Sequence, residues 1–300
     1  MPGGRPFQLL LAAAMSTTAA ARAEPVTLPD TAIEHLTAAS NGIAYKLFVS
    51  LPPGHAGGTG EIQAVLLLDA DYSFPLAHAI GAHLRERRDL PDLLFVSIGY
   101  DGPPAYKLNR TRDYTPVHSA DPGGGYGPEY QAHSGGGPKF FQFIATELMP
   151  MLRKKYRAAP KPLLVGHSYG GLFAAWAILT RPEALAGAII VSPSLWYENN
   201  LLWKLEAGLP AEQRALPRKF YAAVGALEGN PGQGMVEDLN ELGRRLSTPR
   251  YKATAGKVQV LDDETHNSVF PRALTNGLRY FWPRGSFAIS KAPGTRMGPR

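Results

Sequence analysis

Short continuous apolar runs alternate along the chain with longer segments in which apolar residues recur at helical spacing. Three runs are typical of strands buried on both faces, and they are AVLLLDA (64–70), LLFVSIGY (93–100) and LLVGH (163–167). Three further segments are also predicted strands, and they are AGAIIVS (186–192), KFYAAVGA (219–226) and KVQVLDDE (257–264). Helical spacing occurs over 76–88, 139–156, 172–179, 199–208, 234–247 and 268–282. Because strands alternate with helices, we expect an α/β protein with right-handed crossovers and a mostly parallel sheet covered by helices on both faces.

Two segments depart from this alternation. Residues 43–54, IAYKLFVSLPPG, alternate between apolar and polar positions and end in Pro-Pro-Gly, which predicts an edge strand. Residues 101–138 have no clear periodicity, and a stretch of this length is usually a functional loop or disordered. The sequence shows no internal repeat and no interdomain linker, so residues 24–289 are predicted to form one domain.

Both ends of the chain are predicted to lie outside this domain. Residues 1–23 contain the basic Arg5, an apolar run and a small-x-small sequence at 21–23, which are typical of a secretory signal peptide cleaved before Glu24. The apolar run is too short to span a bilayer, and a buried N-terminal helix is the alternative. Residues 290–300 are polar and rich in Pro and Gly, which predicts a disordered tail. We therefore expect an exported protein, periplasmic or secreted, with no stable membrane insertion.

Composition excludes several classes of protein. The chain has no cysteine, which excludes disulfides, thiolate metal sites and a lipid-anchored precursor. Its formal net charge of +6 falls to +4 when Arg5 and Arg22 leave with the signal peptide. No dense Lys/Arg run, P-loop or H-E-x-x-H sequence occurs, so we expect no nucleic acid partner, no metal and no cofactor. A mild positive charge would suit an anionic small substrate.

The most informative motif is Gly166-His167-Ser168-Tyr169-Gly170, which matches G-x-S-x-G between a predicted buried strand and a predicted helix. In that context the serine occupies a tight, strained turn, and the glycines two residues away avoid steric clashes. The turn exposes the hydroxyl as a nucleophile and places the Tyr169 N–H at a helix N-terminus, where it can bind a developing oxyanion. A plain glycine-rich turn is the alternative interpretation.

A serine nucleophile needs a base, and the chain order in this arrangement is serine, acid, histidine. His266 is the histidine that follows the last predicted strand, whereas His167 is expected to point away from Ser168. Glu228 follows the strand between Ser168 and His266, and is the predicted acid that would orient the imidazole. A solvated Glu228, or a Ser–His dyad without an acid, remains an open alternative.

The second oxyanion donor is expected from the loop after the first central strand. That loop lies in LLLDADYSF, and the N–H of Asp71 or Tyr72 is the candidate; the Asp71 side chain has the simpler alternative role of capping the turn. Ser192 and Ser194 lack the motif context of Ser168 and are interpreted as capping residues.

Taken together, these residues resemble the putative-esterase (esterase D-like) family of α/β-hydrolases, and most resemble its branch of siderophore trilactone hydrolases. The matching segments run from about residue 40 to about residue 282, and they are LLLDADYSF, IGY, NRTRDYTP, GGGPKFFQFIATELMPMLRKKY, VGHSYGGLFAAWAIL, SPSLWY and ETHNSVF. The set is specific to this branch but not to one substrate. It departs from the related pattern at Ala70, where glycine is usual.

The resemblance implies an α/β-hydrolase fold and ester hydrolysis through Ser168 and His266, without metal or cofactor. Periplasmic members of the family open the trilactone ring of catecholate siderophores such as enterobactin, and some work as a dyad. The expected function is therefore that of an exported serine esterase acting on a small-molecule carboxylic ester, with a siderophore trilactone as one candidate substrate. A general carboxylesterase, an acyltransferase and, more remotely, a non-catalytic binding protein of the same fold remain open.

Four other side chains acquire candidate substrate-binding roles from this comparison. Trp196 and Tyr197 follow a predicted strand and would wall the pocket and stack on an aromatic acyl group, or pack in the core. Arg110 and Arg112 would bind a substrate anion, or pair with Asp113, and the structural pair is favoured for at least one of them.

Overall fold

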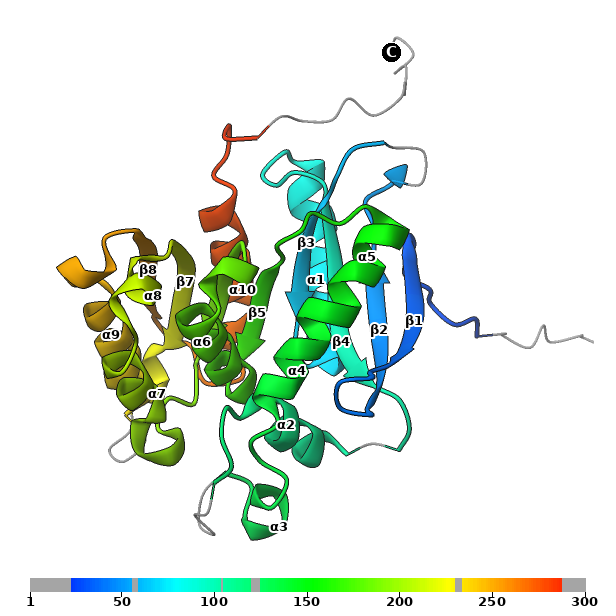
Figure 1. Cartoon of the computed structure of the whole chain (residues 1–300). Helices are drawn as coiled ribbons and strands as arrows, with labels where there is room; N and C mark the ends of the chain where they lie inside the picture. The colour runs from blue at the N-terminus through cyan, green and yellow to red at the C-terminus, as the bar shows by residue number, and fades with distance from the viewer. Residues whose placement is uncertain (1–22, 56–58, 104, 120–124, 230–233, 288–300) are drawn as a thin grey trace, which may run out of the picture.

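The computed structural model describes residues 23–55, 59–103, 105–119, 125–229 and 234–287 (Figure 1). Eight strands form one sheet in the order β1-β2-β4-β3-β5-β6-β7-β8. The strands are β1 (Thr31–Thr37), β2 (Ala44–Ser50), β3 (Gln63–Leu67), β4 (Leu93–Tyr100), β5 (Leu163–His167), β6 (Gly187–Val191), β7 (Arg218–Gly225) and β8 (Thr254–Leu261). β2 pairs antiparallel with both β1 and β4, and all other pairs are parallel. The mostly parallel sheet predicted from the alternation is confirmed.

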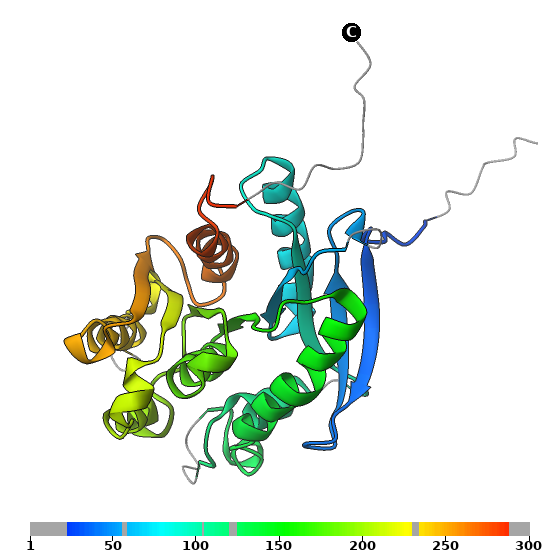
Figure 2. The same ribbon diagram turned by 45° about the horizontal axis from the view of Figure 1, so that its top comes forward.

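Helices cover both faces of the sheet (Figures 1 and 2). α1 and α10 pack against one face, and α4, α5, α6, α7 and α9 lie on the other. The α-helices are α1 (Ala70–Glu86), α2 (Tyr106–Tyr114), α3 (Pro128–Gln131), α4 (Gly137–Phe143), α5 (Met149–Tyr156), α6 (Tyr169–Thr180), α7 (Tyr197–Ala207), α8 (Ala211–Ala215), α9 (Met235–Leu246) and α10 (Val269–Phe281). This double cover explains why the central strands are continuous apolar runs rather than alternating ones.

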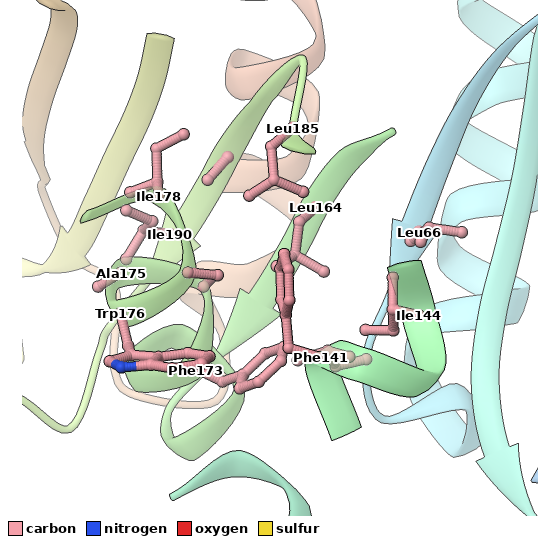
Figure 3. Close-up of a cluster of buried hydrophobic side chains, with 14 of the residues drawn as sticks. Leu66, Phe141, Ile144, Leu164, Phe173, Ala175, Trp176, Ile178, Leu185 and Ile190 are labelled. Atoms are coloured by element: carbon pink, nitrogen blue, oxygen red, sulfur yellow. The ribbon is translucent and has the colours of Figure 1, made fainter. Parts of the chain in front are cut away.

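Successive residues of each central strand enter two different cores. Leu66 belongs to the cluster under α4 and α6, whereas its neighbour Leu67 belongs to the cluster under α1 and α10. Figure 3 shows part of the first cluster, where Leu164 and Ile190 of the sheet lie near Phe173 of α6. Removing apolar area from water on both sides stabilises the sheet by roughly 25 cal/mol per Å², and this makes the sheet a rigid platform for the loops at its edge.

Three local expectations need correction. The strand predicted at 43–54 exists as β2, but it is not an edge strand, because β1 pairs along its outer side. β1 was not predicted, since its half-exposed sequence TAIEHLT has no strong apolar pattern. The described residues of 101–138 include α2, α3 and the start of α4, so this region is not wholly irregular.

The helix predicted over 139–156 is confirmed with an interruption. α4 and α5 are joined by a π-helical turn, Ile144–Leu148. Pro150 in the first turn of α5 has no N–H to donate, and the loss of that bond accommodates the wider turn before it. The predicted signal peptide and tail fall almost wholly on 1–22 and 288–300, outside the described residues, and they stay predictions.

Candidate active site

Ser168 connects β5 to α6 in a strained backbone conformation, with φ 59° and ψ −118°. A non-glycine residue at positive φ costs about 1–3 kcal/mol and tends to occur at functional sites. Gly166 makes the turn possible, because a Cβ at this position would lie 2.0 Å from the Gly170 carbonyl oxygen. The sterically forced turn expected of a nucleophile elbow is therefore present at Ser168.

The second glycine of the motif is less constrained than the sequence suggested. A Cβ on Gly170 would approach Leu68 Cδ1 at 3.2 Å, a contact that a side chain can relieve. A Cβ on Gly171 would instead lie 2.7 Å from the Val191 carbonyl oxygen. Close approach of α6 to β6 therefore depends on Gly171, one residue beyond the motif.

The loops after β7 and β8 bring the predicted acid and base together. His266 Nδ1 lies 2.6 Å from Glu228 Oε2. A carboxylate only accepts hydrogen bonds, so Nδ1 carries the proton and Nε2 is left as the basic nitrogen. The two loops are joined by the Leu227 N–H, which donates to the Glu264 carbonyl oxygen at 3.1 Å. A Cβ on Gly225 would meet the same oxygen at 2.2 Å, so this approach requires glycine.

Glu228 is buried and is held by three donors. Its Oε1 accepts from Ser192 Oγ at 2.6 Å and from the Gly225 N–H at 2.8 Å, while Oε2 accepts from His266. Burial alone would raise the pKa of Glu228, but hydrogen bonds from His266, Ser192 and Gly225 outweigh it and lower the pKa below its ordinary value. The carboxylate is thus kept ionised beside an imidazole that is 38% exposed.

The hydroxyl of Ser168 has a serine neighbour. Among the described residues, the hydrogen-bond partner of Ser168 Oγ is Ser194 Oγ, at 3.5 Å, rather than His266. Bonds between a nucleophile and its base often tighten only in the complex with substrate. Ser194 N–H also donates to the Ser168 carbonyl oxygen at 3.1 Å, so the segment after β6 braces the elbow.

A second histidine packs against the predicted base. The rings of His167 and His266 have centroids 4.6 Å apart, and His167 Nε2 donates to the His266 carbonyl oxygen at 2.7 Å. On the other side of the ring, His167 Nδ1 lies 3.1 Å from Tyr72 OH. Burial, with further contributions from His266 and Arg110, lowers the pKa of His167 to about 3. His167 is therefore neutral in the folded protein at neutral pH.

The predicted oxyanion donors lie at two helix N-termini. Tyr169 is the first residue of α6, and α1 starts at Ala70 after the left-handed Asp69, φ 57°. Tyr72 N–H already donates to the Asp69 carbonyl oxygen at 3.4 Å, whereas the N–H of Asp71 has no acceptor among the described residues. This favours Asp71 over Tyr72. Since Ala70 is helical, the glycine usual in related sequences is not needed at that position.

Both candidate anion-binding arginines are paired with carboxylates of the chain. Arg112 Nε donates to Asp113 Oδ1 at 2.7 Å, the structural pairing considered from the sequence. Arg110 Nε donates to Asp69 Oδ1 at 2.8 Å, with both side chains nearly fully buried. Arg110 also donates to Tyr126 OH. Burial raises the pKa of Asp69, even though the Arg110 guanidinium opposes that rise. The arrangement supports a structural role for both arginines.

The two predicted aromatic residues differ in position. Tyr197 is buried and its hydroxyl donates to the Val117 carbonyl oxygen at 2.8 Å, which anchors the preceding long loop. Trp196 is only half-buried, with its ring centroid 5.9 Å from that of Tyr169. The Tyr126 ring lies 5.4 Å from Tyr169 on another side. Trp196, Tyr169 and Tyr126 thus form an aromatic group beside the elbow, in which Tyr169 is itself buried. The ring of Tyr197, in the core, lies 6.0 Å from that of Tyr169.

Sequence reasoning missed three residues of the site. Ser192 and Ser194 were interpreted as caps, yet their hydroxyls bond Glu228 and Ser168, and neither caps a helix by its side chain. His167 was expected to point away from Ser168 and was given no role in the site. The one available signal was the sequence SPS directly after a buried strand, at the edge where the other candidates emerge.

The part of the chain that the structure describes contains neither a metal-binding cluster nor a membrane-spanning helix. Among its residues, no group of three or more His, Asp or Glu side chains could hold a metal ion. No helix in this part of the chain is long and apolar enough to cross a bilayer.

The fold and the grouping of serine, histidine and carboxylate at the sheet edge define a hydrolase of the α/β-hydrolase class. A family model described as "Putative esterase" matches residues 38–219, and the chain belongs to this family. It is an enzyme that acts on ester bonds.

Its relatives include named esterases. The chain is 29% identical over 265 residues to ferri-bacillibactin esterase BesA of Bacillus subtilis (strain 168), covering 85% of this chain and 90% of the relative. It is 32% identical over 271 residues to the siderophore enterobactin esterase of Emericella nidulans, covering 79% and 88%. A solved structure of the BES protein from Bacillus cereus superposes with a TM-score of 0.75 at 26% identity, covering 88% and 98%. The hydrolase IroE, at 18% identity and a TM-score of 0.64, covers 84% and 94% and shares the fold.

Proposed function

We propose that the protein is a serine esterase in which Ser168 is the nucleophile, His266 the general base and Glu228 the acid. The observation that carries the proposal is the 2.6 Å contact of His266 Nδ1 with Glu228 Oε2, on the same sheet edge as the strained Ser168 turn. This contact selects the tautomer in which His266 Nε2 can accept a proton.

In the first half of the reaction, Ser168 Oγ attacks the ester carbonyl carbon and its proton passes to His266 Nε2. The Glu228 carboxylate stabilises the imidazolium that forms. The carbonyl oxygen becomes an oxyanion, which the N–H groups of Tyr169 and Asp71 would bind. Collapse of this intermediate breaks the carbon–oxygen bond, and His266 Nε2–H donates its proton to the leaving alcohol.

In the second half, water attacks the acyl-serine and the same groups act again. His266 takes one proton from the water as the new bond forms, and returns it to Ser168 Oγ when the acyl–oxygen bond breaks. The products are a carboxylic acid and the free serine. No step requires a metal or a cofactor.

The proposed substrate is the ester of a siderophore, which is a small-molecule partner. Relatives over most of the chain are named as esterases of ferri-bacillibactin, enterobactin and triacetylfusarinine C. The aromatic group of Trp196, Tyr169 and Tyr126 supports an aromatic acyl moiety, because aromatic pairs stabilise by about 0.5–1.5 kcal/mol beyond their buried area. We further propose that residues 1–23 direct export to a periplasm or the exterior, which N-terminal sequencing of the mature protein from its host would test.

The function is tested by hydrolysis of enterobactin and of p-nitrophenyl butyrate by the wild type, Ser168→Ala and Ser97→Ala. Ser97 is a buried serine of β4 and serves as a matched control. We expect both esters to be cleaved, the trilactone with the higher kcat/KM, and Ser168→Ala alone to lose activity. Cleavage of the simple ester only would remove the siderophore assignment, and an active Ser168→Ala enzyme would remove the serine mechanism.

A further inference from the structure

Four neighbouring parallel strands each deliver one polar side chain to the same edge of the sheet. Ser168 follows β5 directly, and Glu228 and His266 follow β7 and β8 within a few residues. The strand between them, β6, ends at Val191 and is followed directly by Ser192. The proposed catalytic groups thus come from the first, third and fourth of these strands, and Ser192 occupies the position of the second.

Ser192 is bound to Glu228 and is enclosed by the protein. Its hydroxyl donates to Glu228 Oε1 at 2.6 Å, and the residue has 0% exposure. Its backbone is in the left-handed region, with φ 39°, where a non-glycine residue is strained. The Ser192 N–H donates to the Ala223 carbonyl oxygen of β7 at 2.8 Å. The strained backbone of Ser192 is thus hydrogen-bonded to β7, and its hydroxyl is hydrogen-bonded to the Glu228 carboxylate.

The terminal torsion of a glutamate is soft, so its carboxylate turns easily unless both oxygens are held. In this site Oε2 binds His266 Nδ1 and Oε1 binds Ser192 and the Gly225 N–H. We propose that Ser192 is a positioning residue that holds Glu228 in the orientation in which it accepts from His266. The inference rests on the proposed serine mechanism and adds a fourth residue that acts through the acid.

Removing the Ser192 hydroxyl should affect catalysis only through Glu228. Ser192 itself acts on Glu228 and not on the ester, so its loss should lower kcat and leave KM nearly unchanged. A hydrogen bond to a charged group is strong enough for a loss of about tenfold in kcat. In an enzyme that already lacks the Glu228 carboxylate, the same substitution should change nothing further, because coupled residues are not additive.

The test is a double-mutant cycle in the full chain, with kcat and KM measured on p-nitrophenyl butyrate. We expect Ser192→Ala to lower kcat about tenfold in the wild-type background and less than twofold in the Glu228→Ala background. The control is Ser97→Ala, which also removes a buried hydroxyl that bonds another serine and should leave kcat unchanged.

Ser192→Gly separates positioning from folding. Glycine tolerates φ 39° without strain, so Ser192→Gly should be more stable to heat than Ser192→Ala while losing as much kcat. A kcat that follows the melting temperature instead of the hydroxyl would overturn the inference, as would equal losses in the two Glu228 backgrounds. If Glu228→Ala keeps full activity, the acid and Ser192 both lose their roles. The role of Ser168 as the nucleophile is tested separately, by the activity of Ser168→Ala.

Discussion

The imidazole of His167 donates from Nε2 to the carbonyl oxygen of His266, 2.7 Å away, and its ring lies over the His266 ring with centroids 4.6 Å apart. A residue of the nucleophile turn thus holds both the backbone and the ring of the proposed base. A charged His167 would repel the imidazolium that His266 becomes during the reaction. Burial prevents this, since the pKa of His167 is lowered to about 3.

The buried histidine makes stability depend on acidity. Unfolded, His167 takes up a proton near its ordinary pKa of 6.5, whereas folded it does so only near 3. Between these values the unfolded state binds more protons, so the free energy of unfolding falls by up to about 1.4 kcal/mol for each pH unit below 6.5. Replacing His167 by Gln should lower stability at pH 7 and flatten the decline toward pH 4.

Urea unfolding at several pH values measures both effects. The control is His35→Gln, because His35 is a surface residue whose side chain is 61% exposed. Parallel curves for wild type and His167→Gln would show that another group causes the acid sensitivity.

Glu228→Gln should impair catalysis more than stability. The amide can present an N–H toward His266 Nδ1, which favours the wrong tautomer of the base. We expect kcat on a simple ester to fall by about 10² to 10⁴-fold. Asp262→Asn, an exposed carboxylate just after β8, is the matched control. A larger loss in Asp262→Asn than in Glu228→Gln would move the acid to the β8 loop.

The two glycines that flank Ser168 should respond differently to alanine. Gly166→Ala places a Cβ 2.0 Å from a backbone oxygen that cannot move away, and we expect a loss of about 1–3 kcal/mol or more. Gly170→Ala meets only a flexible leucine at 3.2 Å, and alanine favours the helix by about 1 kcal/mol. The free energy of unfolding of Gly170→Ala should therefore differ little from that of the wild type. Thermal unfolding of the two variants decides this, and equal losses would contradict the steric difference.

The buried pair of Arg110 and Asp69 should be sensitive to removal of one partner. Arg110→Leu leaves a buried carboxylate unpaired, which we expect to cost about 3–5 kcal/mol. Asp69→Asn in the same chain should restore part of the loss, because an amide carries no charge and asparagine tolerates the left-handed conformation. Lys155→Ala, which breaks the exposed pair with Glu34, should cost less than about 1 kcal/mol. Urea unfolding measures these losses. Equal losses of unfolding free energy in Arg110→Leu and Lys155→Ala would contradict the importance of the buried pair.

Trp196 is expected to act on aromatic acyl groups. Trp196→Ala should raise KM about tenfold for p-nitrophenyl benzoate and little for p-nitrophenyl acetate, since both share the leaving group and only the benzoate has an aromatic acyl group that can stack on Trp196. Trp203→Ala is the control. Trp203 is a tryptophan of α7 whose ring packs against the Arg245 guanidinium of α9 instead of the Ser168 turn. Equal changes for the two esters would place Trp196 outside the acyl pocket.

Much of the architecture can be predicted from short segments of the sequence. Apolar runs predicted β3, β4, β5, β6 and β7, because a strand buried on both faces has few polar positions. The segment KVQVLDDE predicted β8, which forms the edge of the sheet and is mostly exposed or half-buried. The Gly166-x-Ser168 turn follows from sterics within a few residues. The sequence by itself determined the strands and this turn, because each depends on residues that are neighbours in the chain. The chain order also made His266 and Glu228 the candidate base and acid.

Other features depend on contacts that only packing creates. From the sequence, β1 could not be distinguished from a loop, because it is half-exposed and its place in the sheet comes from pairing with β2. The partner of Arg110 is 41 residues away, so Asp113 was the natural guess from sequence, whereas the fold supplies Asp69. Ser192 and His167 acquire their roles because adjacent parallel strands end side by side. That juxtaposition depends on the strand order and register, which no short stretch of sequence specifies, and only the tertiary structure decided it.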